Sequence, residues 1–350
     1  MRVAANPLAA LANRLGSCRH ADERKTRVRR RRSVVCALLA AALMLGTGTT
    51  AAAPIDGRLI GVLGGTDRSD SIAEAYPSPS RIEARAFYSE TLERAMPYFI
   101  YLPPGYDTSD RRYSVLYMLH GMGGSNTEWK GYNLLGTADN MIKSGEIPPL
   151  LIVLPQGDQS YWVDHANGGP RWGQYTAQDV VAEIDASWRT VPDRDHRAIG
   201  GLSMGAHGAL QLAMRYPNVF GIVGAHSPTL RDYESSLEWF GPDLFGDERW
   251  FAEHDPVSLI EAHPGTARRL KIWLDVGDGD LTWRPVVTDL HDRLVALGVP
   301  HEFHVLTGHH DGDDYWAVHG AEYLRFYGRA LFGTASAGAS AAGLPGAAVS

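Results

Sequence analysis

Short apolar runs alternate with helix-like segments along most of this 350-residue chain, and this alternation restricts the fold more than any other feature. The apolar runs YSVLYMLH, LLIVLP, GIVGAHS and LKIWLDVG each have about the length of one strand. Helical spacing is clear between them, for example at Val180, Ile184 and Trp188. Strands that alternate with helices form a mostly parallel central sheet with helices on both faces. We therefore predict an α/β fold.

Two segments depart from this alternation. The runs RIEARAFYS and MPYFIYLP predict an antiparallel hairpin at the start of the domain. Residues 227–268 contain SLEWFGPDLFGDERWFAEHDP, which is rich in aromatic and acidic side chains and indicates a small insertion. Ligands bind at the carboxyl ends of the strands in open α/β sheets. We predict that the insertion lies over these strand ends.

The first 53 residues differ in composition from the rest of the chain. They contain ten of the 33 Lys and Arg residues but two of the 40 Asp and Glu residues. A basic stretch precedes the apolar run Val34–Leu45 and the small residues GTGTTAAAP, a pattern typical of a cleaved secretory signal peptide. We predict a secreted or extracytoplasmic protein, with a cell-envelope location open. The alternatives are a retained N-terminal anchor and, from Arg31-Arg32, twin-arginine rather than general export.

Composition also sets the predicted boundaries of the mature domain. Residues 54–81 form a linker or a loosely packed segment, residues 82–332 the folded α/β domain, and residues 333–350 a disordered tail that is too poor in large apolar side chains to fold. Without residues 1–53 the chain has 23 basic and 38 acidic side chains, a formal charge of −15. This charge argues against nucleic acid or stable membrane association as partners. Both cysteines lie in the predicted signal peptide, which excludes a thiol nucleophile from the mature domain.

The pentapeptide Gly201-Leu202-Ser203-Met204-Gly205 matches the motif G-x-S-x-G between a predicted strand and a predicted helix. In this context the chain turns sharply at the serine, and the flanking glycines avoid steric overlap. The turn exposes the hydroxyl at the start of a helix, where negative charge is favoured. We predict that Ser203 is a nucleophile. The alternative is a glycine-rich turn with an unreactive serine.

A nucleophilic serine needs a base and an acid that orients the base, and in this architecture the acid precedes the histidine in the chain. The segment LKIWLDVGDGD offers Asp275, Asp278 and Asp280. Asp275 belongs to the strand, which favours a packing role, and we predict Asp280 as the acid with Asp278 next. The segment FHVLTGHHDGDDYW offers His309 and His310, and we predict His310 as the base.

A second glycine cluster, LHGMGGS, follows the strand YSVLYML and should lie beside the serine. The tetrahedral intermediate of acyl transfer carries an oxyanion that needs two N–H donors. We predict the backbone N–H groups of Met122 and Met204 as these donors. A phosphate-binding loop is the alternative, but the cluster lacks the Lys-Ser/Thr ending and the G-x-G-x-x-G spacing.

The succession IYLPPGYD, VLYMLHGMGG, RAIGGLSMGAHGAL, DVGDGD and TGHHDGDDYW resembles the esterase D-like branch of the α/β-hydrolases, over residues 82–332. This branch includes feruloyl and acetyl-xylan esterases, S-formylglutathione hydrolases and secreted mycolyltransferases. The resemblance implies the α/β-hydrolase fold, serine esterase activity and no cofactor. It assigns the G-x-x-D acid to Asp280 and the G-x-H-D base to His310, although the additional His309 departs from the usual pattern. It also assigns the nucleophile and the oxyanion donors to the residues predicted above.

Metal binding is a competing interpretation of the C-terminal histidines. The ligand-type side chains are His301, His304, His309, His310, Asp311, Asp313 and Asp314. On a strand, His301 and His304 point to opposite faces and cannot easily bind one ion. The sequence also lacks H-E-x-x-H and an EF-hand loop. We therefore predict no metal and no other cofactor.

Aromatic residues near the predicted site are candidates for substrate contact. They are Trp162, Trp172, Tyr175 and Trp239, with Phe240, Trp250 and Phe251 also in the insertion. Each could stack on a sugar or aromatic acyl group, or could pack the interior. The predicted function is hydrolysis of a small-molecule or carbohydrate ester, such as an acylated sugar or a feruloyl ester. The alternatives are acyl transfer to a sugar hydroxyl and a non-catalytic envelope binding module.

Overall fold

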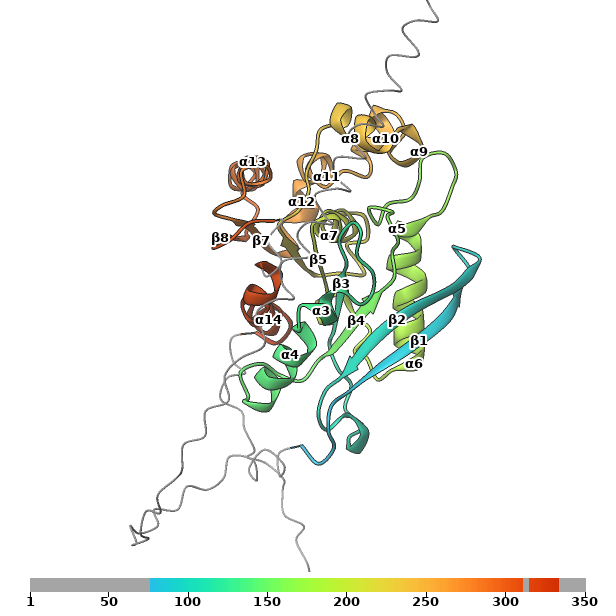
Figure 1. Ribbon diagram of the computed structural model, residues 1–350, viewed down its shortest axis with the longest axis vertical. Helices are drawn as coiled ribbons and strands as arrows, with labels where there is room; N and C mark the ends of the chain where they lie inside the picture. Colours follow the sequence, from blue (N-terminus) through green and yellow to red (C-terminus); the bar gives the residue numbers. More distant parts are fainter. Residues whose placement is uncertain (1–75, 311–314, 334–350) are drawn as a thin grey trace, which may run out of the picture. The chain divides into compact units, whose positions relative to one another are not determined.

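An eight-stranded sheet with the order β1-β2-β4-β3-β5-β6-β7-β8 runs through the molecule (Figure 1). The computed structural model describes residues 76–310 and 315–333. The predicted signal peptide, nearly all of the predicted linker and all but the first residue of the predicted tail lie outside these residues.

The sheet begins with the predicted hairpin. Strand β1 (Arg81–Ser89) pairs antiparallel with β2 (Arg94–Leu102), and β2 pairs antiparallel with β4 (Leu151–Pro155). From β4 onwards all neighbouring strands are parallel. These strands are β3 (Val115–Leu119), β5 (Arg197–Leu202), β6 (Ile222–His226), β7 (Lys271–Gly277) and β8 (Glu302–Leu306). The predicted mostly parallel α/β sheet is therefore confirmed.

Every residue of β3, β4, β5 and β6 is buried, as expected for strands that are covered on both faces. One core cluster packs α6, α7 and α13 against one face, and a second packs α4 and α14 against the other (Figure 1). These helices are α4 (Leu134–Lys143), α6 (Val181–Ser187), α7 (Met204–Arg215), α13 (Arg284–Ala296) and α14 (Tyr315–Phe332). Both layers of the predicted fold are present.

Shorter helices complete the connections. The segment before α6 is α5 (Trp172–Gln174) followed by a π-helical turn, η2 (Tyr175–Val180). The loop after β3 leads into α3 (Glu128–Gly131). Two short 3₁₀ helices are η1 (Tyr106–Thr108) and η3 (Arg194–His196). None of the helices in residues 76–310 and 315–333 combines the length and apolar character that crossing a membrane requires.

The connection between β6 and β7 contains five short helices near α7 (Figure 1). They are α8 (Tyr233–Phe240), α9 (Pro242–Phe245), α10 (Glu248–Ala252), α11 (Pro256–Ala262) and α12 (Pro264–Ala267). Three of the nine acidic residues in this insertion are helix caps. Asp232, Asp247 and Asp255 each accept a backbone N–H from the first turn of a helix, which satisfies donors that the helix leaves unpaired.

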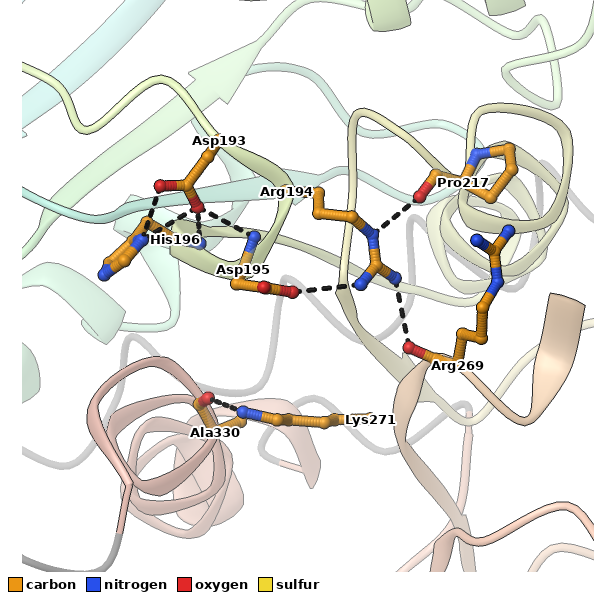
Figure 2. A network of polar contacts seen from close by, with 8 residues as sticks. All are labelled: Asp193, Arg194, Asp195, His196, Pro217, Arg269, Lys271 and Ala330. Carbon is orange, nitrogen blue, oxygen red and sulfur yellow. Dashed lines mark hydrogen bonds and ion pairs between the residues drawn. The ribbon is translucent and has the colours of Figure 1, made fainter.

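A polar network closes the amino end of β5, opposite the end that carries the serine (Figure 2). Asp193 caps η3, and Arg194 donates to the carbonyl oxygens of Pro217 and Arg269 at 2.7 and 3.0 Å. Lys271 at the start of β7 donates to the carbonyl oxygen of Ala330 at 2.5 Å. These contacts satisfy backbone carbonyls in the loops before β6 and β7 and in the last turn of α14, so this end of the sheet has a structural role.

Candidate active site

Ser203 occupies the turn between β5 and α7 with φ 56° and ψ −116°, a conformation that L-residues rarely adopt. Glycine is required on both sides of the serine, because neighbouring backbone atoms leave no room for a Cβ there. A Cβ on Gly201 would lie 2.5 Å from the backbone of Gly205, and one on Gly205 would lie 2.5 Å from the carbonyl oxygen of Leu119. The motif G-x-S-x-G therefore forms a strained turn that presents the serine at the carboxyl edge of the sheet.

His310 lies next to this serine. Its Nε2 is 2.8 Å from Ser203 Oγ, within hydrogen-bond distance. The histidine follows β8 at the same edge of the sheet as the serine, because β5 and β8 run parallel in one sheet. The neighbouring His309 is exposed to solvent. The structure thus brings His310, and not His309, into contact with the hydroxyl.

Among the described residues, Asp280 is the carboxylate that forms an ion pair with the imidazole. Its Oδ2 lies 3.9 Å from His310 Nδ1, and the side chain is buried. Its Oδ1 accepts the backbone N–H groups of Thr282 and Trp283, whereas Oδ2 has no hydrogen-bond partner among the residues described. The carboxylate is therefore fixed by the turn and faces the imidazole at ion-pair distance. Asp278 instead accepts the N–H of Gly308, which joins the two loops that carry acid and base.

Ser227 is a polar neighbour of the imidazole that the sequence analysis did not identify. Its Oγ lies 2.8 Å from His310 Nδ1, closer than the carboxylate of Asp280. The residue directly follows β6, is fully buried and has φ 49°. An Nδ1–H that donates to Ser227 leaves Nε2 unprotonated, so that it can accept the proton of Ser203. The available signal was the position of this serine at the end of the strand next to β5.

The glycine loop after β3 lies against the nucleophile, as predicted. A Cβ on Gly121 would lie 3.4 Å from the Cβ of Ser203 and 2.5 Å from the side chain of Leu202. Side-chain acceptors fix the loop on both sides of Met122. Gly121 N–H donates to Glu128 Oε2 at 2.6 Å, and Gly123 N–H donates to the side-chain oxygen of Gln159 at 2.6 Å.

The backbone N–H groups of Met122 and Met204, the two donors that the sequence analysis predicted for an oxyanion, have no acceptor among the described residues, and neither has that of Gly205. The side chain of Met122 is half exposed, and that of Met204 is fully buried. Since each neighbour of Met122 in the loop already has an acceptor, its N–H is the donor left for a ligand.

Glu128 holds the loop from inside the protein. Burial raises the pKa of this carboxyl group, and the hydrogen bond from Gly121 acts in the opposite direction. The fit is close, because a Cβ on Gly124 would lie 2.5 Å from Glu128 Oε2. We infer that Glu128 is a positioning residue that sets the direction of the Met122 N–H.

Glu128→Ala is expected to lower kcat for ester hydrolysis by about ten- to hundredfold, the effect of losing one charge-assisted hydrogen bond. Glu128→Gln keeps an oxygen that can accept from Gly121 and should lose less than about tenfold. Steady-state kinetics with thermal unfolding as the folding control measure both variants. Equal kcat in Glu128→Ala and the parent at equal folded fraction would contradict the assignment.

A second buried histidine–carboxylate pair supports the site without reaching it. His226 Nδ1 lies 2.8 Å from Asp275 Oδ2, and its Nε2 lies 2.9 Å from the hydroxyl of Tyr327. Tyr315 donates to the other oxygen of Asp275 at 2.8 Å, and burial together with this carboxylate raises the pKa of Tyr315. The backbone carbonyls of His226 and Asp275 accept the N–H groups of Ser203 and Ser227. Asp275 therefore has the packing role that its strand position favoured.

Three predicted substrate contacts need correction. Trp162 and Tyr175 are fully buried in the core, where Trp162 donates to the carbonyl of His120 and Tyr175 stacks on Phe87. Trp172 is also buried; it lines a cavity of about 460 Å³, and the guanidinium of Arg94 lies over its ring. The sequence showed that these rings follow a strand but not that the chain folds over them.

The aromatic residues of the insertion divide into two groups. Trp239 is 70% exposed and remains available for a ligand. Phe240, Phe245 and Phe251 pack on one another, and Trp250 stacks on His254. Packing therefore accounts for all the candidates in the insertion except Trp239.

No group of three or more metal-ligating side chains is present in the described part of the chain, which excludes residues 311–314. His301 forms a pair with His291 at 2.7 Å, and His304 stacks on Trp273. The two histidines are therefore engaged by different neighbours.

Comparison with known proteins places the chain among esterases. The family model described as "Putative esterase" matches residues 89–322. An esterase of Mycobacterium tuberculosis is 29% identical over 243 residues, 60% of this chain and 51% of its own length, so the chain spans about half of that relative. An acetyl esterase of Caldicellulosiruptor saccharolyticus is 28% identical over 66% of this chain and 91% of its own length.

A solved ferulic acid esterase superposes with a TM-score of 0.64 at 26% identity, over 72% of this chain and 99% of its own. An S-formylglutathione hydrolase from Staphylococcus aureus superposes with a TM-score of 0.60 at 20% identity, over 71% and 99% of the two chains, which shows the fold. The sheet order and these superpositions confirm the α/β-hydrolase fold. With the family model matched over residues 89–322, the chain belongs to the esterase family of α/β-hydrolases.

Proposed function

We propose that this protein is a carboxylic-ester hydrolase that works through an acyl-enzyme on Ser203. The observation that carries the proposal is the 2.8 Å contact between Ser203 Oγ and His310 Nε2 at a strained strand-to-helix turn. The N–H groups of Met122 and Met204 have no acceptors among the described residues and supply the donors for the oxyanion. The esterase names of the relatives support the same reaction class.

In the first step, His310 Nε2 accepts the hydroxyl proton while Ser203 Oγ attacks the ester carbonyl carbon. The carbonyl oxygen becomes an oxyanion, and the N–H groups of Met122 and Met204 stabilise it. The intermediate then collapses, the bond to the alcohol oxygen breaks, and this oxygen takes the proton from Nε2. The acyl group remains as an ester on Ser203.

In the second step, water attacks the acyl-enzyme and His310 takes a proton from it. Collapse of the new intermediate releases the acid and returns the proton to Ser203. In both steps the imidazole is transiently cationic. Ser227 accepts from Nδ1–H, and the negative charge of Asp280 stabilises the cation at a distance of 3.9 Å.

The proposed substrates are small acyl esters, including acetylated sugars and feruloyl esters. The names of the acetyl esterase and the ferulic acid esterase among the similar proteins support this choice. Trp239, exposed on the insertion, offers a face for a sugar or an aromatic acyl group. Export is a further proposal that the composition of residues 1–53 supports.

Treatment with a fluorophosphonate is expected to label Ser203 in the native protein, because the reagent phosphonylates only an activated serine. Peptide mass spectrometry locates the adduct, and a panel of 4-nitrophenyl acyl esters, feruloyl esters and acetylated sugars measures turnover. Denatured protein is the control and should remain unlabelled. Absence of an adduct on Ser203 in folded protein would favour a non-catalytic binding module.

A further inference from the structure

Arg231 lies between three aromatic rings in the connection that leaves β6. Its guanidinium carbon is 4.6 Å from the ring centre of Trp283 and 5.4 Å from the ring centres of both Trp239 and Phe240. The residue is partly buried. A cation over aromatic faces is held in place while its edge stays available for hydrogen bonds.

This guanidinium is next to the catalytic groups. The ring of Trp283, which contacts Arg231, is 5.7 Å from the ring of His310. The backbone N–H of Trp283 donates to Asp280 at 2.9 Å, which ties this ring to the proposed acid. One indole ring therefore separates Arg231 from the imidazole.

The connection that carries Arg231 is also anchored to the nucleophile. Two residues before Arg231, the N–H of Thr229 donates to the carbonyl oxygen of Ser203 at 3.4 Å. Tyr161 contacts Thr229 Oγ1 at 3.2 Å and accepts from Arg231 Nη1 at 2.7 Å. These contacts fix the position of the guanidinium relative to Ser203.

Arg231 forms no ion pair with any of the described residues, although the chain has more acidic than basic side chains. Two arginines elsewhere do have one: the buried Arg197 pairs with Asp185, and the partly buried Arg215 pairs with Asp164. Of the five N–H donors of Arg231, one meets Tyr161, and the others meet no acceptor in this part of the chain. A planar cation with free paired donors matches the two oxygens of a carboxylate.

We propose that Arg231 is a specificity residue that binds a carboxylate group of the substrate. This inference rests on the proposed function and narrows its substrate class to esters that carry a second, anionic group on either the acyl or the alcohol part. The carboxylate would lie at Arg231 with the ester carbonyl at Ser203. The exposed face of Trp239 then flanks the portion of the substrate between the two groups.

Two pairs of model esters separate the acyl side from the alcohol side. The acyl pair is mono(4-nitrophenyl) adipate and the neutral 4-nitrophenyl hexanoate, and the alcohol pair is 4-carboxyphenyl acetate and the neutral 4-carbamoylphenyl acetate. We expect the parent protein to prefer the anionic member of one pair. Arg231→Gln should lower kcat/KM for that member by about ten- to hundredfold and change the neutral member by less than about threefold.

Arg249→Gln is the matched control. This arginine lies on α10 of the same insertion, is highly exposed and pairs with Glu253. Arg249→Gln removes one positive charge, the same change in net charge as Arg231→Gln. Arg249→Gln should leave the preference for the anionic ester intact, and Arg231→Lys should retain part of this preference. An equal loss on the neutral and anionic esters in Arg231→Gln would show a structural clamp and overturn the proposal. Lack of any anionic preference in the parent protein would also overturn it.

These measurements distinguish failure of the Arg231 proposal from failure of the proposed hydrolase function. If the neutral esters are turned over and the anionic esters are not preferred, the proposed role of Arg231 is wrong and the proposed hydrolase function is supported. If no ester is turned over, the hydrolase fails, and binding of adipate and 4-hydroxybenzoate is measured by tryptophan fluorescence. Quenching that Arg231→Gln abolishes would support the carboxylate site, and identical titrations of the two proteins would end it.

Discussion

Ser203→Ala is expected to lower kcat on 4-nitrophenyl esters by at least about 10³-fold while the protein folds normally. The alanine removes the hydroxyl oxygen that lies 2.8 Å from His310 Nε2 and that would carry the acyl group, so no acyl-enzyme can form. The oxyanion donors remain, and the residual rate reflects their stabilisation of direct attack by water. Because ground-state contacts are unchanged, KM should move little compared with kcat.

Ser144→Ala is the matched control for this experiment. Its hydroxyl donates to the carbonyl of Met141 at the end of α4, in the helical layer on one face of the sheet. It should retain full activity. Thermal unfolding of both variants verifies folding. A Ser203→Ala protein that keeps its rate would exclude the acyl-enzyme mechanism.

The elements of the fold were predictable because their signals are local. Runs such as VLYML and LIVLP are buried on both faces and therefore apolar throughout, which identifies interior parallel strands. The turn at Ser203 was also predictable, because glycine stands two residues before and two residues after the serine. The structure gives the reason: a Cβ on Gly205 would lie 2.5 Å from the carbonyl oxygen of Leu119, so only glycine fits. Chain order then restricted the acid and base to the loops after β7 and β8.

Contacts between distant side chains were not predictable in the same way. Ser227 resembles any serine at a strand end, and its contact with His310 depends on how two loops 83 residues apart approach each other. Glu128 is one of many acids in helix first turns, and only its hydrogen bond to Gly121 reveals its role. The burial of Trp162 likewise depends on tertiary packing, here against His120 and Gly208. Such roles come from geometry that residue type does not encode.

The two neighbours of His310 Nδ1 should differ strongly in their effect on catalysis. Asp280→Asn is expected to lower kcat by about 10³- to 10⁴-fold, the effect of losing the carboxylate in the well-studied Ser-His-Asp triad of serine proteases. Ser227→Ala removes one neutral hydrogen bond and should cost about five- to tenfold. Steady-state kinetics on one neutral ester measure both variants, with thermal unfolding as the folding control.

The difference follows from the charge that develops on the imidazole. The carboxylate of Asp280 acts on the imidazolium across 3.9 Å inside a buried site, whereas the Ser227 hydroxyl at 2.8 Å fixes only the tautomer. A larger loss in Ser227→Ala than in Asp280→Asn would contradict this order and identify the hydroxyl as the main partner of the base.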